Sequence, residues 1–490
     1  MALKASESFI RYVTMGAASA HRAVELLNQR GHDVRELERY ATCNKIWQTK
    51  IKRLRMPDLS CLRCGRRFEV RAKTKLEIKM SDSPTVAGRE WDAGLRDEDV
   101  VIFVRCDGQA TPPTPAEQIA GFEVGQLRAC VDRSRLGPPK SAGEGAERDR
   151  TWPAIVPSSS GHVLFVGDEK ISLRLDTGRQ QTFQLRRRGA ELLTPYVGVG
   201  ERIQGEVQFL AGAPARPASL DCSGGAWDPV RGLTENDTMN RFSAVKAAGL
   251  LQRADAADAL LTIAHTDPDQ RVRLEAAGSL LRLSHPGAAD AVLVHFDAPE
   301  RPDLRMESVL LVGEVRTTAA KSLLETMLGR LVVGTEEELR AAIIWSLGLC
   351  GAGDVIVPYL SDPSDSVAGH AAVALGAPLS SSIRARLIAV LASGDTRAVA
   401  SAAWVLTRDG TDVVGPLLEA SQDPTVRGWV VSILGRRSPA EISPRLEAYP
   451  EIGQLVAPWW NLWPGSNWSS APEGVRVLQD LAQQEIFQAI

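Results

Sequence analysis

An internal repeat in the C-terminal half constrains the fold of this 490-residue chain more than any other feature. A nine-residue apolar segment recurs seven times, and successive segments start 28 to 35 residues apart. The segments are 242–250, 272–280, 304–312, 339–347, 367–375, 398–406 and 426–434. Each is followed by a second apolar stretch, so one period holds two helices and two turns. The repeat predicts an α-solenoid over residues 236–449.

Proline recurs at fixed places in these units. Pro358, Pro416 and Pro444 fall near the predicted start of the second helix, where a missing N–H costs little. Asp-Pro pairs begin at residues 267, 362 and 423, just before the next unit. The segments and this punctuation resemble HEAT repeats of about 30 residues per unit. The resemblance implies an extended surface that binds a protein partner or nucleic acid. An irregular helical bundle is the alternative.

Residues 450–490 are rich in tryptophan, with Trp459, Trp460, Trp463 and Trp468 in one short stretch. A final repeat must cover its exposed apolar face, and large rings do this well. We therefore predict a C-terminal cap, with a helix over 472–490. A platform on which a ligand stacks is the alternative.

Two further segments precede the solenoid. Residues 111–150 are rich in Pro, Gly and charge and are predicted to form a linker with one short helix near 115–119. Residues 151–235 carry short alternating runs separated by turns, which predict a small β-barrel or sandwich. Its expected strands are 162–166, 171–175, 182–185 and 202–209. This β domain either spaces the flanking parts or binds a ligand.

Residues 1–110 are predicted to form a basic α/β domain that starts with a helix over 17–47, broken at Gly31. Positive charge is concentrated in residues 50–79, with eleven Lys or Arg against three acids, although the whole chain has a net charge of −3. A nucleic-acid backbone, most simply DNA, is the partner that such a face attracts. A solvated strand face is the alternative. The candidate phosphate-binding residues are Lys50, Lys52, Arg53, Arg55, Arg66 and Arg67.

The three acids of this basic segment are Asp58, Glu69 and Glu77. On a strand, Glu69, Arg71 and Lys73 share one face because side chains alternate. If the intervening C-x-x-C-G is a hairpin turn, Asp58 lies opposite or diagonal to Glu69. Two carboxylates beside cations are what Mg²⁺-dependent phosphodiester hydrolysis requires.

Pro57-Asp58, a ten-residue spacer and Glu69-Val70-Arg71 resemble the motif of the PD-(D/E)xK nucleases. The sequence departs from that motif at Arg71, where the family has Lys, although Lys73 lies on the same strand face. Glu77-Ile78-Lys79 is a second register with a longer spacer. The resemblance implies a restriction-endonuclease-like domain in which Asp58 and Glu69 hold Mg²⁺. It also implies an upstream carboxylate, for which Glu36 or Glu38 would serve.

Cys61-Leu62-Arg63-Cys64-Gly65 is similar to a zinc knuckle, in which two thiolates bind from a tight turn. A structural zinc site needs four ligands, and Cys43 and Cys106 are the remaining candidates that the sequence suggests. Two free thiols in a hairpin are the alternative. The seven histidines are scattered without metal-ligand spacing.

No apolar run approaches the roughly 18 residues that span a bilayer, and the N-terminus lacks the apolar core of a signal peptide. We therefore expect a cytoplasmic protein without membrane contact. The leading prediction is a Mg²⁺-dependent endonuclease with a helical-repeat recognition arm, acting in genome defence or DNA processing. The alternative is a non-catalytic adaptor in which a zinc-stapled basic module holds nucleic acid and the solenoid holds a protein.

Overall fold

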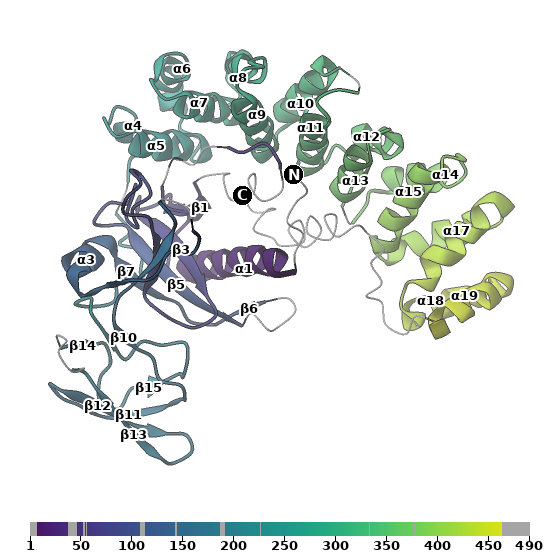
Figure 1. Ribbon diagram of the computed structural model, residues 1–490. Helices are drawn as coiled ribbons and strands as arrows, with labels where there is room; N and C mark the ends of the chain where they lie inside the picture. The colour runs from purple at the N-terminus through teal and green to yellow at the C-terminus, as the bar shows by residue number, and fades with distance from the viewer. Residues whose placement is uncertain are drawn as a thin grey trace. The chain divides into compact units, whose positions relative to one another are not determined.

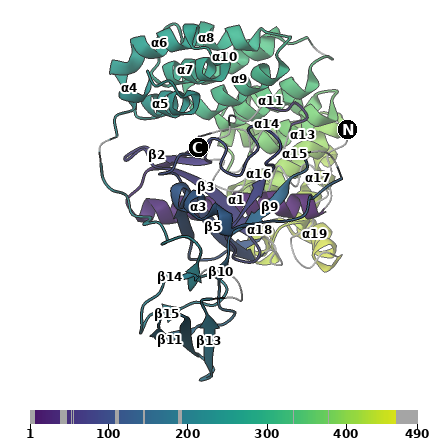
Figure 2. The ribbon, with the colours of Figure 1, turned by 60° about the vertical axis from the view of Figure 1, so that its left-hand side comes forward.

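The computed structural model describes residues 7–37, 47–51, 54, 56–107, 113–142, 145–186, 192–225, 227–332, 334–376 and 378–462. They form two compact units. The first, called here the sheet unit, comprises the described residues up to Leu251 except 47–51. The second, the solenoid unit, comprises Gln252 onward together with residues 47–51. Figures 1 and 2 show the helices and strands of both units.

The sheet unit is built on a six-stranded mixed sheet in which the order is β1-β2-β3-β5-β6, and β7 also pairs with β5. Strands β3 and β5 are parallel, and the other pairs in this sheet are antiparallel. The bounds are β1 Val34–Glu36, β2 Leu59–Cys61, β3 Arg67–Lys73, β5 Val100–Asp107, β6 Thr114–Pro115 and β7 Ala120–Glu123.

Alternation along β5 explains how both faces of this sheet are covered. Val100, Ile102 and Val104 pack with helix α1 (Glu7–Gln29) in one apolar core. Val101 and Phe103 point into a second core on the other face. Because side chains on a strand alternate, an unbroken apolar run such as β5 is buried on both sides.

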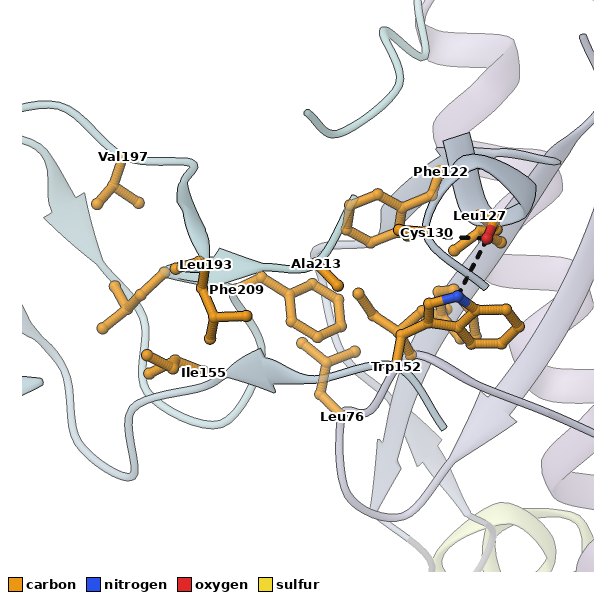
Figure 3. Packing of buried hydrophobic residues seen from close by; sticks show 14 of the residues in the cluster. Leu76, Phe122, Leu127, Cys130, Trp152, Ile155, Leu193, Val197, Phe209 and Ala213 are labelled. Atoms are coloured by element: carbon orange, nitrogen blue, oxygen red, sulfur yellow. Dashed lines mark hydrogen bonds between the residues drawn. The ribbon is translucent and has the colours of Figure 1, made fainter. Parts of the chain in front are cut away.

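The second core continues into the smaller sheets, as Figure 3 shows. Phe122 of β7 packs against Phe209 and Tyr196, with ring centroids 5.6 Å apart in each case. Trp152 is buried and donates its indole N–H to the Leu127 carbonyl at 3.1 Å. The main sheet and the smaller sheets therefore share one continuous core.

The predicted linker is wrong for most of residues 111–150. Within it, β7 joins the main sheet, and α3 (Val124–Ala129) buries Val124 and Leu127. Strands β8 (Arg135–Leu136) and β9 (Arg148–Thr151) form a three-stranded sheet with β4 (Lys79–Asp82). The segment is rich in Pro, Gly and charged residues, which led to the linker prediction. Its short apolar runs nevertheless enter the core.

The strands predicted between residues 151 and 209 are largely confirmed. A four-stranded antiparallel sheet has the order β13-β12-β11-β15, and a three-stranded sheet has the order β10-β16-β14. The last predicted strand, 202–209, is much shorter than expected. The bounds are β10 Ala154–Ile155, β11 Gly161–Val166, β12 Lys170–Leu175, β13 Gln180–Gln184, β14 Thr194–Pro195, β15 Arg202–Ile203 and β16 Ala211–Gly212.

All seven repeated segments are helices, which confirms the repeat prediction. The bounds of these first helices are α5 Thr238–Leu250, α7 Gln270–Arg282, α9 Pro302–Val315, α11 Glu337–Leu349, α13 Asp365–Ala374, α15 Thr396–Arg408 and α17 Pro424–Gly435. Helix α5, preceded by α4 (Pro229–Gly232), belongs to the sheet unit. The second helices are α6 Ala257–Thr266, α8 Ala288–Phe296, α10 Thr318–Arg330, α12 Gly353–Ile356, α14 Ser381–Val390, α16 Val414–Ala420 and α18 Pro439–Leu446. From α6 onward these pairs stack in a row (Figure 1).

Glycines let first helices of neighbouring repeats approach closely. A Cβ on Gly313 of α9 would lie 2.6 Å from the Ser346 side chain of α11. A Cβ on Gly348 of α11 would lie 2.6 Å from the Ala374 carbonyl oxygen of α13. These separations leave no room for a side chain, so each glycine is needed at its crossing.

Buried charge pairs add to the contacts between repeats. Arg282 of α7 pairs with Glu314 of α9 at 2.9 Å, and within its own helix with Glu275 at 3.2 Å. Arg384 of α14 pairs with Asp409, which follows α15, at 2.6 Å. The side chains of these pairs are at most 11% exposed and are hydrogen-bonded, as charges in a protein interior must be.

The last described helix, α19 (Pro450–Leu462), packs against α17. Trp459 lies over Gly435, where a Cβ would meet the Trp459 Cβ at 2.5 Å. The capping role of this Trp-rich segment stays a prediction. Trp463, Trp468 and the helix predicted over 472–490 lie outside the described residues.

Candidate functional site

Hairpin β2–β3 carries the predicted catalytic residues of the sheet unit. Its register pairs Leu59 with Phe68 and Ser60 with Arg67, so Asp58 and Glu69 follow as the next facing pair. Asp58 accepts the Val70 N–H through Oδ2 at 2.9 Å. The C-x-x-C-G segment is the turn, as predicted, and brings Asp58 beside the strand that carries Glu69.

Glu69 and Arg71 line a polar cavity of about 340 Å³. Glu69 is only 2% exposed and pairs with Arg71 at 2.6 Å. The other lining residues are Met56, Ser81, Asp82, Ser83, Arg89, Glu90, Trp91, Ala93, Leu95 and Glu147. We call this the acidic cavity, because it contains four carboxylates and two guanidinium groups.

Asp82, at the end of β4, is a cavity residue that the sequence reasoning missed. It is 1% exposed, and its Oδ2 accepts from the Arg150 Nε at 2.5 Å. Its Oδ1 is buried and has no hydrogen-bond partner among the described residues. A buried carboxylate oxygen without a partner is costly, so it marks a place where a cation or donor would be stabilised. The signal in the sequence was an acid between two serines after an alternating strand.

Lys73 and Asp58 do not line the acidic cavity. Burial, together with repulsion from Arg71 and Lys79, lowers the pKa of Lys73 to about 8. Glu77 and Lys79 of the second register form an ion pair at 3.0 Å, and Lys79 also pairs with Asp149. Lys79 lies on β4 in a different sheet from Glu69, so the two registers are separate in the structure.

The upstream carboxylate, Glu36 or Glu38, was expected on a helix predicted over residues 17–47. The observed helix ends before these residues. Helix α1 ends at Gln29, and Gly31 adopts a left-handed conformation with φ +86°. The chain then continues as β1, on which Glu36 pairs with Leu59. The predicted helix is confirmed as far as Gln29, and so is its break at Gly31, but no helix follows the break within the described residues 32–37. Glu38 lies outside the described residues.

Several residues of the predicted basic face have other roles. Arg67 is 2% exposed and forms a double hydrogen bond with buried Asp99, so it cannot contact a phosphate backbone. Arg66 donates to the Ser219 carbonyl and to Glu123. Lys50 belongs to the solenoid unit and donates to the Trp47 carbonyl at 2.6 Å. Lys52, Arg53 and Arg55 lie outside the described residues.

Three cysteines and one histidine converge beside the tip of hairpin β2–β3. The nitrogen or sulfur atoms of His32, Cys61, Cys64 and Cys222 all lie within 4.8 Å of one another. We call these residues the thiol cluster. A hydrogen bond from the Cys64 thiol, with further ones from backbone N–H groups, lowers the pKa of Cys61 to about 4.

Only Cys61 and Cys64 of this cluster were predicted from the sequence. Cys106 is buried at the end of β5 and is not a member of the cluster, although the sequence suggested it as a ligand. Cys43 lies outside the described residues. His32 and Cys222 are 190 residues apart in the chain, and no local spacing could have connected them.

In the solenoid unit, residues 47–51 lie against first helices α11 and α13. Trp47 is 3% exposed and stacks on His370, with ring centroids 4.9 Å apart and planes 22° apart. The Glu338 carboxylate accepts from the backbone N–H groups of Gln48 and Thr49, and from the Thr49 hydroxyl at 2.7 Å. A short bent segment is therefore held by its backbone and by one aromatic ring. We call this place the segment site.

Burial under the Trp47 ring lowers the pKa of His370. His370 Nδ1 lies 2.6 Å from the Ser366 carbonyl of its own helix. The neutral ring therefore presents a flat apolar face to the indole. Sequence reasoning missed this site, because neither His370 nor Glu338 is distinguished by its local pattern.

Fold and sites define the class as a helical-repeat protein that also contains a sheet-rich unit. Residues 230–313 match the family of HEAT repeats. The search among curated proteins found no match. The family match does not extend to the N-terminal residues, so the resemblance of residues 57–71 to PD-(D/E)xK nucleases stays a prediction.

Solved structures with low sequence identity were also found. The CpcE–CpcF complex of phycocyanin lyase from Nostoc sp. PCC7120 is 19% identical, covering 47% of this chain and 93% of that one, with a TM-score of 0.25. The YibA protein of Escherichia coli is 14% identical, covering 52% and 91%, with a TM-score of 0.28. Human deoxyhypusine hydroxylase is 18% identical, covering 50% and 99%, with a TM-score of 0.22. TM-scores this low do not support a conclusion about the fold or function of this chain.

No helix among the described residues combines the length and apolar character needed to cross a membrane.

Proposed function

We propose that this protein is a helical-repeat adaptor whose solenoid binds a short segment of a protein partner. The observation that carries the proposal is the segment site, which already holds residues 47–51 of the same chain. Glu338 accepts two consecutive backbone N–H groups. This contact depends on the main chain and does not select a particular side chain. The stack of Trp47 on His370 adds selectivity for an aromatic residue.

Helix α11 contributes more than a carboxylate to this site. Glu338 lies in the first turn of α11, where the helix dipole stabilises a negative charge. A partner segment with an aromatic residue followed by two free N–H groups would satisfy the same contacts. Residues 47–51 would then be an intramolecular occupant that the partner displaces.

The test is a binding competition in the full-length protein. A fluorescent peptide with the sequence of residues 45–52 is titrated into wild type, Trp47→Ala and Glu338→Ala. We expect the peptide to bind Trp47→Ala more tightly than wild type, because the occupant is weakened. We expect Glu338→Ala combined with Trp47→Ala to lose that gain. Glu325→Ala, on second helix α10, is the matched control and should change nothing.

Equal binding of the peptide to all variants, or no binding to any, would overturn the proposal. If the peptide binds as expected, proteins cross-linked to Trp47→Ala but not to the double variant become candidate partners. This comparison ties a captured protein to the segment site.

A second candidate, a Mg²⁺-dependent phosphodiesterase, is favoured by one observation. Glu69 and Asp82 place two buried carboxylates in the acidic cavity, and Asp82 Oδ1 has no hydrogen-bond partner among the described residues. These two residues would hold Mg²⁺, which supplies charge stabilisation to a phosphate group when bound. Arg71 and Arg89 would orient the phosphate oxygens. Among the described residues, however, no third carboxylate joins these two as a metal-ligand group, so the adaptor remains the leading proposal.

The phosphodiesterase is tested with plasmid DNA, linear DNA and RNA, each with Mg²⁺ or Mn²⁺. Cleavage by wild type should fall at least 100-fold in Glu69→Gln and Asp82→Asn. Glu77→Gln, which breaks the ion pair of the second register, is the control. Cleavage that depends on Glu77 but not on Glu69 would identify the other register. Absence of cleavage in wild type would reject this candidate.

A further inference from the structure

We propose that the thiol cluster is a structural Zn²⁺ site formed by His32, Cys61, Cys64 and Cys222. The site links three parts of the sheet unit: the chain after α1, the tip of hairpin β2–β3, and the segment that precedes α4. The proposal does not depend on the adaptor function.

The distances suit a tetrahedral zinc ion. With Zn–S bonds of about 2.3 Å and Zn–N bonds of about 2.0 Å, neighbouring ligand atoms are separated by about 3.5–3.8 Å. The Cys64 sulfur lies 3.7 Å from His32 Nδ1. All four ligand atoms lie within 4.8 Å of one another, so small side-chain rotations suffice to reach ideal geometry.

The second ring nitrogen of His32 is already held. His32 Nε2 lies 3.1 Å from the Leu220 carbonyl oxygen, to which it can only donate a proton. The neutral ring then carries its proton on Nε2 and directs the Nδ1 lone pair at the sulfur atoms. Metal-binding histidines are oriented in this way by a carbonyl on the far nitrogen. The Phe68 ring, 5.2 Å away at 86°, fixes the plane of the imidazole.

The backbone around the site is arranged to bring the ligands together. The Leu62 N–H donates to the Asp33 carbonyl at 2.8 Å, and the Cys222 N–H donates to the Arg30 carbonyl at 3.1 Å. Gly65 has φ +72° and lies against the Trp227 ring, where a Cβ would be 2.8 Å away. Only glycine fits this turn. These contacts join segments whose side chains supply the ligands.

A metal explains this composition better than disulfide chemistry does. Cys61, Cys64 and Cys222 are free cysteines in the structure, and three thiols can form only one disulfide, which would leave one thiol and the imidazole unused. Three thiolates with one histidine are a common ligand set of structural zinc sites. Because all four positions are filled by protein ligands, the ion has no open position for a substrate.

The first experiment measures zinc in full-length protein purified without chelators. We expect about one zinc per chain in wild type, and less than about 0.2 in Cys222→Ser. Cys106→Ser tests the ligand suggested by the sequence and should keep its zinc. Cys350→Ser, in the solenoid unit, is the matched control for loss of a thiol.

The second experiment starts from wild type, so its first result does not depend on the folding of a variant. X-ray absorption of the wild-type zinc should give three sulfur ligands near 2.3 Å and one nitrogen near 2.0 Å. His32→Cys should keep the metal and change the shell to four sulfurs. Zinc-free wild type that takes up neither Zn²⁺ nor Co²⁺, a shell without sulfur, or zinc lost in Cys106→Ser but kept in Cys222→Ser would each overturn the proposal.

Discussion

The buried Arg67–Asp99 pair gives the sharpest test of how the sheet unit is stabilised. Arg67 donates from Nε to Asp99 Oδ1 at 2.9 Å and from a terminal nitrogen to Oδ2 at 2.5 Å. Their side chains are 2% and 0% exposed. Removing one partner of such a pair leaves an uncompensated buried charge, which costs about 3–5 kcal/mol.

The two single substitutions should differ, because the partners that remain differ. In Arg67→Met, Asp99 keeps the Arg96 backbone N–H at 2.7 Å and the Arg96 guanidinium at 3.3 Å. We therefore expect a loss near the lower limit, about 3 kcal/mol. In Asp99→Leu, the contacts left to Arg67 among the described residues are the long ones to Gly94 and Asn240. We expect a loss near the upper limit, about 5 kcal/mol.

Hydrogen exchange of the β5 amides measures this loss within the sheet unit. When exchange requires global opening, a loss of about 3 kcal/mol speeds it by about 150-fold. The double variant should lose about 2–3 kcal/mol less than the sum of the single variants, because neither charge remains. Additive losses, or single losses below about 1 kcal/mol, would refute the assigned role and return Arg67 to the set of surface cations.

Three further predictions concern the solenoid. Burial lowers the pKa of His295 from 6.5 to about 4. Between these pH values the unfolded chain binds more protons than the folded one. The free energy of unfolding therefore falls as the pH drops from 6.5 to 4, by up to about 3 kcal/mol. Urea unfolding across this pH range should show a flatter dependence in His295→Gln than in wild type, and an equal dependence would contradict the assignment. Gly348→Ala should destabilise by about 1–3 kcal/mol in thermal unfolding, because its Cβ would meet the Ala374 backbone, whereas Gly428→Ala, with open space around its Cβ, should be neutral or slightly stabilising. Asp269→Ala should cost about 1 kcal/mol, since Asp269 caps α7 by accepting two backbone N–H groups, and Asp269→Asn should restore most of that stability.

The solenoid could be predicted because each repeat is a local pattern. Apolar periodicity, the spacing of the segments and Asp-Pro punctuation all act within one unit. Asp423 caps α17 and Pro424 occupies its first turn, as the pattern predicts. In the other two pairs, Asp267 and Asp362 instead follow the preceding helix, and each accepts an N–H two residues later. The pattern located these turns without specifying their hydrogen bonds.

The candidate sites could be predicted only in part, because each depends on contacts between distant segments. The hairpin turn of Cys61 and Cys64 is local, and it was predicted. Cys222 and His32 reach the same place only after the segment before α4 packs beside the hairpin. The burial of Arg67 could not be predicted either. Arg67 follows directly after Arg66, and the sequence does not distinguish a surface guanidinium from a buried one.

Because residues 47–51 occupy the segment site, any partner must bind tightly enough to displace them. Gln48 and Glu338 are 290 residues apart in the same chain, so a partner competes with an intramolecular segment. We take the effective concentration of this segment as about 1 mM. If the isolated segment bound with a Kd of about 0.1 mM, a competing partner would lose about tenfold in apparent affinity, or about 1.4 kcal/mol. A modification of Thr49 that removed its hydroxyl contact with Glu338 would lower the affinity required for this displacement without changing the partner. The Thr49–Glu338 contact within the chain would then decide how easily a partner gains access to the segment site.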